Sequence, residues 1–192
     1  RVMRCNEMDG SVAWRAEIGE KFSQPIFVDD EIYVATEPGR LVSLDAVTGD
    51  AKWATQFPQP LESGPGVNDR ANRGYITGDH SNLYLINTQD GSCIESYYIG
   101  HEEKTVRVPP IPLLGHVFVI ENAGSEYANL HVLRVNDQGE ELKKAQAPFR
   151  LTGNVLVPPI IEGRRLIVLT DRGEVTVFDI EPTAERDQVS VA

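Results

Sequence analysis

The sequence predicts an all-β protein whose short antiparallel strands form repeated meanders of four. Apolar runs rich in Val, Ile and Tyr alternate with turns that contain Gly, Pro or Asp. A turn motif, the end of the third strand and the start of the first strand recur at a regular spacing along the chain. No segment has a sustained helical period with caps, and the nearest candidate, Glu140–Ala147, lies where a fourth strand is due. Together these three observations favour a repeated β-meander.

One stretch, Gln24–Trp53, shows the complete repeat. Four apolar runs of strand length follow one another, and residues that favour tight turns separate each run from the next. The turns lie at Asp29–Asp30, Pro38–Gly39 and Thr48–Gly49, and the fourth run ends at Trp53. This order predicts four antiparallel strands joined by short turns.

The same order recurs along the chain. DGSVAW at Asp9–Trp14 lies 39 residues before TGDAKW at Thr48–Trp53, and DGSCIE at Asp90–Glu95 begins 42 residues after Thr48. Gly139 lies 48 residues beyond Gly91. A four-stranded meander with a period of about 40 to 49 residues is typical of a propeller blade. Two further marks keep this phase, namely third-strand ends at Cys5–Asn6, Leu44–Asp45, Ile86–Asn87, Val135–Asn136 and Phe178–Asp179, and first-strand starts at Pro25, Pro65, Pro110 and Pro159.

We therefore expect residues 1–192 to form a single β-propeller that is a fragment or a half-propeller, with about three whole blades and two partial ones from a larger ring. An open ring leaves sheet edges and a blade face uncovered, which favours self-association that completes the ring. Two alternatives remain. One is a closed ring of four blades in which the first two strands complete the last blade, and the other is a pair of stacked sheets. The expected blades are 1–17 (partial), 24–57, 64–99, 108–147 and 156–180 (partial).

The composition excludes several classes of function. The chain has 29 acidic and 18 basic side chains, and its net charge of −11 argues against binding to nucleic acid or to an anionic membrane surface. No run approaches the roughly 18 consecutive apolar residues of a membrane-spanning helix, so we expect no membrane insertion by this segment. Cys5 and Cys93 form neither a CxxC motif nor a paired ligand spacing, and they leave the compartment undetermined.

The stretch EIYVATEPGRLVSLDAVTGDAKW, at Glu31–Trp53, resembles the repeat of PQQ-like β-propellers. It contains an apolar strand, a Gly turn, Leu-Asp-Ala, Thr-Gly and then Trp. The resemblance is recognisable at Asp9–Trp14 and Gly78–Ile94 and weak from Val108 onward. The family includes quinoprotein dehydrogenases, BamB-like outer-membrane assembly lipoproteins, and sensor or scaffold domains of bacterial proteins. The resemblance implies PQQ-like blades and an extracytoplasmic location, in the periplasm or cell envelope.

The sequence shows no recognisable catalytic, cofactor or metal site. Quinoprotein enzymes of the resembled family carry an adjacent Cys-Cys pair, whereas Cys5 and Cys93 are 88 residues apart. Trp14 and Trp53 each end a fourth strand, where the family's repeat places a residue that docks one blade on the next. The four histidines lack ligand spacing. We therefore predict no cofactor, no metal and no catalytic residue, which favours a non-enzyme.

A binding surface is the remaining candidate. In propellers of this kind, the connections from each fourth strand to the next first strand rim one mouth of the channel, and loops on a rigid scaffold concentrate recognition. Phe22 and Phe149 are the first candidates because aromatic residues beside Lys or Arg are common binding anchors. The connections span residues 16–23, 56–63, 100–107 and 146–154, and their candidate partner-binding residues are Lys21, Phe22, Glu62, His101, Lys104, Arg107, Phe149 and Arg150.

These observations favour a non-catalytic propeller scaffold that binds an unidentified protein partner, similar to BamB-like or sensor-domain members of the family. The alternative is part of a quinoprotein-type dehydrogenase, or a small-ligand-binding module, whose active groups lie outside this stretch. A scaffold predicts a macromolecular partner, whereas an enzyme predicts converging acidic or histidine residues at the channel mouth. The turns at Asn68–Gly74 and Asn122–Asn129 are longer than a hairpin requires. They are either secondary candidates for partner contact or insertions without a function.

Overall fold

The computed structural model describes residues 1–100, 102–182 and 189–190. Within these ranges there is no α-helix, and one 3₁₀ turn, η1 (Asp69–Ala71), separates two strands. The strands form successive antiparallel sheets, each built from strands that are neighbours in sequence. The predicted all-β fold of four-stranded meanders is therefore confirmed.

We name the sheets blades 1 to 5 in chain order. Blades 1 and 2 contain β1 (Val2–Cys5), β2 (Val12–Ala16), and then β3 (Ile26–Val28), β4 (Glu31–Ala35), β5 (Arg40–Asp45) and β6 (Ala51–Gln56). Blade 3 contains β7 (Gly66–Asn68), β8 (Arg73–Thr77), β9 (Asn82–Asn87) and β10 (Cys93–Tyr98). Blade 4 contains β11 (Ile111–Leu113), β12 (His116–Ala123), β13 (Tyr127–Val135), β14 (Leu142–Lys144) and β15 (Phe149–Thr152). Blade 5 contains β16 (Ile160–Glu162), β17 (Arg165–Leu169) and β18 (Val175–Asp179), and the short strands β19 (Glu181–Pro182) and β20 (Val189–Ser190) follow it.

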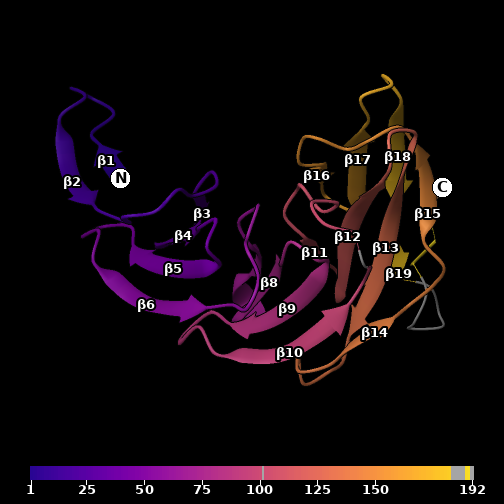
Figure 1. Cartoon of the computed structure of the whole chain (residues 1–192), viewed down its shortest axis with the longest axis horizontal. Coiled ribbons are helices and arrows are strands. Elements are labelled where there is room, and N and C mark those ends of the chain that lie inside the picture. The colour runs from indigo at the N-terminus through magenta and orange to yellow at the C-terminus, as the bar shows by residue number, and fades with distance from the viewer. Residues whose placement is uncertain (101, 183–188, 191–192) are drawn as a thin grey trace.

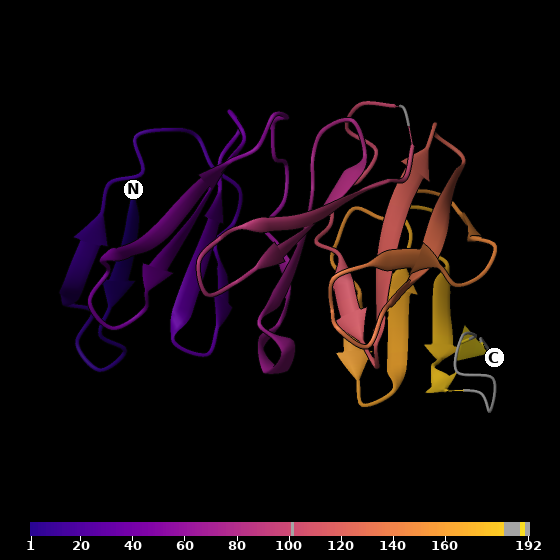
Figure 2. The same ribbon diagram turned by 90° about the horizontal axis from the view of Figure 1, so that it is seen from below.

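The five blades follow one another along an open arc, with β3 and β11 on the concave side and β6 and β10 on the convex side (Figure 1). Figure 2 shows the blades side by side in chain order. Blades 1 and 5 lie at opposite ends of the arc and form separate sheets. The alternative of a closed four-bladed ring is therefore wrong, because each blade packs on its neighbour in sequence and carries the two ends of the described chain apart.

The turn between the third and fourth strands is shaped by the Asp or Asn at the end of the third strand. In blade 2, Asp45 Oδ1 accepts hydrogen bonds from the backbone N–H groups of Val47 and Thr48, each at 2.8 Å. In a tight turn the backbone N–H groups have no strand carbonyl to pair with, and a short polar side chain accepts their hydrogen bonds instead. This local chemistry explains the repeated Asp or Asn, and the corresponding acceptors in blades 1, 3 and 4 are Asn6, Asn87 and Asn136.

Both tryptophans dock one blade on the next, as the repeat predicts. Trp14 Nε1 donates a hydrogen bond to the carbonyl oxygen of Ala46 in blade 2 at 3.1 Å. Trp53 Nε1 donates to the carbonyl oxygen of Thr88 in blade 3 at 2.8 Å. A Cβ atom on Gly49 would lie 2.6 Å from the Trp14 ring, so the turn that receives the ring requires glycine. The tryptophans were expected at the end of the fourth strand, but Trp14 lies in the middle of β2 and Trp53 in the middle of β6. From there each indole joins successive blades.

Blade 3 joins blade 4 through different side chains, because Glu95 stands in the tryptophan position. Glu95 Oε2 accepts a hydrogen bond from the backbone N–H of Leu142 at 2.6 Å. Arg73 Nε donates to the carbonyl oxygen of Gly139 at 2.5 Å. The Gly139 turn therefore still packs against the preceding blade. Hydrogen bonds made by two charged side chains, Glu95 and Arg73, replace the hydrogen bond of the indole.

Four apolar clusters fill the spaces between successive blades. We call the face of a blade that meets the following blade its leading face, and the face that meets the preceding blade its trailing face. In blade 2, Tyr33 and Ala35 lie on the leading face, whereas Val34 and Val42 lie on the trailing face. Alternation along each strand therefore gives the middle blades two buried faces.

Blade 4 departs from the predicted boundaries at its fourth strand. That strand consists of two pieces, because β14 pairs with one end of β13 and β15 pairs with the other. Phe149–Thr152 was predicted within the 146–154 connection, but it forms β15. The predicted turn at 122–129 is also shorter than expected, since β12 continues to Ala123 and β13 begins at Tyr127.

Candidate functional site

Each connection into a blade lies against the far end of that blade's second strand. Phe22 forms an antiparallel bridge with Thr36, and Leu61 forms one with Gly78. In blade 5 the backbone N–H of Asp171 donates to the carbonyl oxygen of Asn154 at 2.8 Å. Backbone pairing therefore fixes these connections on the scaffold, and side chains of the connections and the nearby hairpin turns share one rim.

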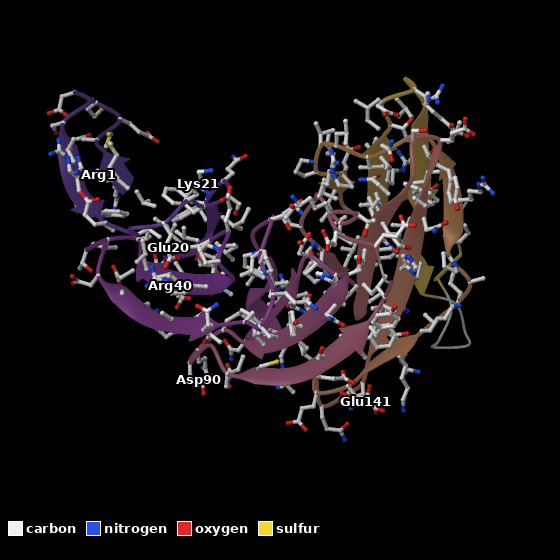
Figure 3. All side chains as sticks on the ribbon, in the orientation of Figure 1. Arg1, Glu20, Lys21, Arg40, Asp90 and Glu141 are labelled. Carbon is white, nitrogen blue, oxygen red and sulfur yellow. The ribbon has the colours of Figure 1, made fainter. Side chains whose placement is uncertain are left out.

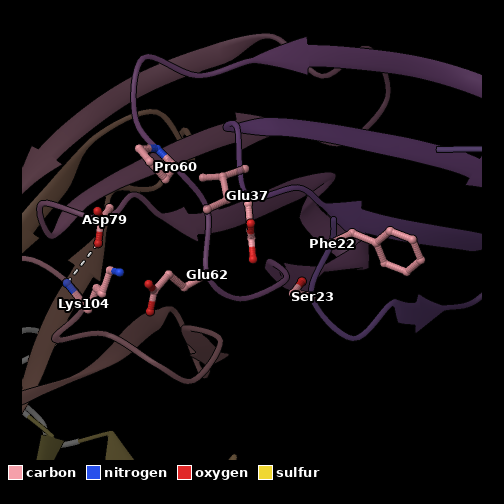
Figure 4. Close-up of a pocket in the computed structure, with 8 residues that line it drawn as sticks. Phe22, Ser23, Glu37, Pro60, Glu62, Asp79 and Lys104 are labelled. Carbon is pink, nitrogen blue, oxygen red and sulfur yellow. Dashed lines mark hydrogen bonds between the residues drawn. The ribbon is translucent and has the colours of Figure 1, made fainter. Parts of the chain in front are cut away.

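A depression of about 470 Å³ opens on this rim. It receives side chains from three successive connections and from the hairpin turns of blades 2 and 3 (Figure 4). Three predicted contact residues, Phe22, Glu62 and Lys104, come together here. We call this depression the rim notch; it is lined by Phe22, Ser23, Glu37, Pro60, Leu61, Glu62, Asp79 and Lys104.

The rim notch is polar in its middle and apolar at its floor. In Figure 4 the Glu62 carboxylate is directed toward Lys104 and the Glu37 carboxylate lies between Glu62 and Ser23, whereas the Phe22 ring lies at the edge and points away from both carboxylates. Leu61 is 1% exposed and packs in the core between blades 2 and 3. Phe22 also packs partly against the core between blades 1 and 2.

Negative charge predominates in the notch. Burial, and then the nearby charge of Asp79, raises the pKa of the Glu62 carboxyl, while the charges of Lys104 and Arg107 act in the opposite direction. The backbone N–H of Lys104 donates to Asp79 Oδ1 at 3.0 Å, so Asp79 also holds the third connection in place (Figure 4). The notch can therefore receive a partner side chain with hydrogen-bond donors or positive charge.

Lys21 stands beside the notch rather than in its lining. Its Nζ lies 3.7 Å from Glu37 Oε2, and both side chains are exposed. Glu20 and Arg40 form a second pair, with Glu20 Oε2 3.4 Å from Arg40 Nε. Figure 3 shows Glu20, Lys21 and Arg40 near one another on the inner part of the arc. Two ion pairs thus flank the notch on its blade 2 side.

Arg107 lies next to the notch and lines a neighbouring depression of about 370 Å³ together with Asn154 and Asp171. Arg107 Nε donates to the carbonyl oxygen of Lys104 at 3.3 Å, which ties it to the same connection. His101, predicted on that connection, lies outside the described residues. The predicted residues of the third connection are therefore shared between two adjoining depressions.

Phe149 and Arg150 do not join this site. Phe149 packs with Phe178 at a ring-centroid distance of 5.7 Å, against the core between blades 4 and 5. The Arg150 guanidinium lies 3.8 Å from the centroid of the Tyr127 ring. The apolar residues Phe149 and Leu151 alternate with polar Arg150 and Thr152, a period of two that indicates a strand and could have located β15.

Sequence reasoning missed Glu37 and Asp79, which contribute to the notch from hairpin turns rather than from connections. A signal for them exists in the repeat. An acidic residue follows the buried Thr at the end of the second strand, directly in Thr36-Glu37 and Thr170-Asp171 and after one glycine in Thr77-Gly78-Asp79. These turns meet the connections, so the recurring acid marks the rim.

Within the described ranges, no group of three or more His, Cys, Asp or Glu side chains is placed to hold a metal ion. Cys5 and Cys93 are exposed free thiols. No helix of membrane-spanning length and hydropathy occurs in that part of the chain.

Repeated four-stranded blades, joined by the Trp-to-carbonyl contacts and arranged along an arc, define a β-propeller protein of the PQQ-like class. The family described as "Outer membrane protein assembly factor BamB" matches residues 1–137, and the chain belongs to this family. The resemblance seen in the repeat is thereby confirmed.

Individual relatives agree with this assignment. A BamB from Yersinia pestis is 29% identical over 99 residues, covering 48% of this chain and 25% of the relative. A BamB from Taylorella asinigenitalis (strain MCE3) is 34% identical over 62 residues, covering 31% of this chain and 16% of the relative. The crystal structure of BamB from Moraxella catarrhalis superposes with a TM-score of 0.66 at 17% identity, over 95% of this chain and 56% of that one. The matched parts thus span a quarter or less of the curated relatives, and the structural likeness establishes the fold.

Proposed function

We propose that this chain is a non-catalytic propeller scaffold that binds a protein partner through the rim notch. The observation that carries the proposal is that three successive connections bring Phe22, Glu62 and Lys104 to the lining of one depression. Backbone bridges hold the first two of these connections against blades 2 and 3. A rigid, partly apolar recess with charged side chains offers a partner both anchoring and orientation.

The family supports the biological setting of this proposal. The matching family and both curated relatives are described as outer membrane protein assembly factors. We infer that this chain serves the assembly of outer membrane proteins in the bacterial cell envelope, on the extracytoplasmic side. Its role there is to hold another protein, because the described rim presents recognition groups on a scaffold of packed blades.

Site-specific photo-crosslinking in the native host tests the proposal. A photoreactive phenylalanine analogue replaces Phe22 in the natural full-length protein, and the cross-linked products are identified by mass spectrometry. We expect one dominant protein adduct. The matched control is Tyr98, an aromatic residue that is 51% exposed and belongs to β10, a strand at the convex side of the arc.

A second variant separates recognition from folding. Glu62→Lys reverses one charge of the notch while leaving the backbone bridge at Leu61 in place. We expect it to reduce the Phe22 adduct by at least about tenfold, as loss of a desolvated charge contact does. Equal adducts from positions 22 and 98, or an adduct that Glu62→Lys leaves unchanged, would show that the notch is not the contact site.

A further inference from the structure

Backbone pairing places equivalent residues of the four connections along the rim. In each connection one carbonyl oxygen accepts a hydrogen bond of 2.8 to 2.9 Å from a backbone N–H at the end of the second strand of the same blade. The residue after each acceptor packs into the cluster between that blade and the preceding one. In blade order the donors are Glu37, Asp79, Asn122 and Asp171, the acceptors are Lys21, Pro60, Thr105 and Asn154, and the packed residues are Phe22, Leu61, Val106 and Val155.

Two rows of side chains follow from this pairing. We call the residues directly after the packed ones the connection row, namely Ser23, Glu62, Arg107 and Leu156, and we call the four donors the turn row. The rim notch is lined by both rows in blades 2 and 3, and the neighbouring depression by both rows in blades 4 and 5. Lys104 lines both depressions, so together they form one track across four blades, which we call the rim track.

The connection row is open to solvent where a blade lies on each side. Glu62 and Arg107 belong to the connections into blades 3 and 4, which both have two neighbouring blades, and both residues are exposed. Leu156 is 50% exposed at the equivalent place in the connection into blade 5. The opening of the rim track is therefore a property of this position in the repeat.

The rim track presents an excess of negative charge and of hydrogen-bond acceptors. Six carboxylates line it against two cations, Lys104 and Arg107. Each depression also has a lining residue whose side-chain oxygen is buried without a hydrogen-bond partner in the described part of the chain, Ser23 Oγ in the notch and Asn154 Oδ1 in its neighbour. A binding segment that carries positive charge and N–H donors complements this surface. The six carboxylates belong to Glu37, Glu62, Asp79, Glu102, Glu103 and Asp171.

We infer that the protein partner binds as an extended segment with a net positive charge, which runs along the rim track and places side chains in both depressions. The inference rests on the proposed function and adds the shape and the charge of the bound segment. An extended chain advances about 3.3 Å per residue, so a short segment can reach from one depression to the next. Leu156 offers an apolar contact at the blade 5 end of the track.

Photo-crosslinking at both ends of the rim track tests the inference. The photoreactive phenylalanine analogue replaces Leu156 in the natural full-length protein in the native host, and its adducts are mapped beside those from Phe22. We expect both positions to label one partner within a single stretch of roughly ten residues that has more Lys and Arg than Asp and Glu. If Phe22 labels a partner but Leu156 labels nothing, another protein or a distant segment, the proposed function stands and this inference is wrong. If neither position exceeds the Tyr98 control, the proposed function itself fails.

Charge reversal tests the electrostatic part of the inference. Glu102 is exposed and lines the second depression, and its backbone carbonyl accepts the hydrogen bond from Ser81 Oγ, so Glu102→Lys leaves that contact in place. We expect Glu102→Lys to reduce the Leu156 adduct at least about threefold. The matched control is Asp137→Lys, at an exposed acid in the β13–β14 turn, which should leave the adduct unchanged. Thermal melting checks that both variants fold. Equal adducts from the two variants, or a mapped segment with a net negative charge, would overturn the inference.

Discussion

At the scale of single residues, the indole of Trp53 shows how one side chain holds two blades together. Its ring belongs to blade 2 and its N–H reaches the carbonyl oxygen of Thr88 in blade 3 at 2.8 Å. Trp53→Phe keeps most of the apolar ring and removes the donor. We expect it to lower the free energy of unfolding by about 1 kcal/mol, since a part-buried carbonyl loses its partner.

Urea denaturation measures this effect, with Trp14→Phe as the matched variant at the blade 1–2 junction, where Trp14 Nε1 donates to Ala46. Both variants should lower the urea concentration at the unfolding midpoint and leave the dependence of the unfolding free energy on urea concentration unchanged. An unchanged midpoint for Trp53→Phe would show that the indole N–H contributes nothing to the junction.

A second residue-scale prediction concerns the hydrogen bond between Glu121 and His131 in blade 4. His131 Nε2 lies 2.9 Å from Glu121 Oε2, and the side chains are only 16% and 15% exposed. The hydrogen bond from His131 lowers the pKa of the Glu121 carboxyl despite its burial. Because the folded-state pKa is below the unfolded value of about 4.3, the stabilisation is complete above that value. It is lost as the pH falls through the folded-state pKa.

Glu121→Gln therefore should destabilise the protein at pH 7, and the difference from wild type should shrink as the pH falls below about 4. Chemical denaturation at several pH values measures this, and Glu126→Gln, in the exposed turn between β12 and β13, is the control. A difference between Glu121→Gln and wild type that is the same at pH 7 and pH 3 would contradict the assignment.

At the scale of elements, the turn between the third and fourth strands joins local geometry to blade packing. Gly49 and Gly10 occupy corresponding turns with φ of 80° and 70°, a region that favours glycine. A Cβ on Gly49 would meet the Trp14 ring at 2.6 Å, whereas a Cβ on Gly10 would have no atom within 4 Å. Gly10→Ala should cost about 1 kcal/mol from backbone strain alone.

Gly49→Ala should cost clearly more than Gly10→Ala, because the docking ring of Trp14 must also move. Thermal unfolding of the two variants measures the difference directly. Trp14→Ala combined with Gly49→Ala removes the obstructing ring, so the excess cost of Gly49→Ala should disappear in that background. Equal costs for Gly49→Ala and Gly10→Ala would mean that the packing of Trp14 on the turn is unimportant.

Elements also show why some features were predictable from sequence and others were not. The strands and the Trp junctions repeat local chemistry, so Asp45 and Trp53 reveal their roles through neighbours in sequence. The rim notch depends on side chains from separate segments, and Glu37 and Asp79 enter it only after the blades pack. Phe149 was misplaced because the repeat predicted a connection there, whereas pairing with the unusually long β13 extends the sheet.

At the scale of the whole molecule, the blades form a nearly one-dimensional array in which each contacts only its neighbours. Such arrays gain stability from the interfaces between units, so a unit with two covered faces opens less often than one with a single covered face. Blade 3 is covered on both sides, whereas blades 1 and 5 each have one open face. We expect amide protection to fall from the middle of the arc toward its ends.

Hydrogen exchange followed by mass spectrometry can resolve this gradient at peptide level. In the 192-residue chain, peptides from β17 and β18 should exchange faster than peptides from β8 and β9, because Val175 and Val177 leave one face of their sheet in water. Uniform exchange across the blades would contradict the gradient, because it would mean that the five blades open as one cooperative unit.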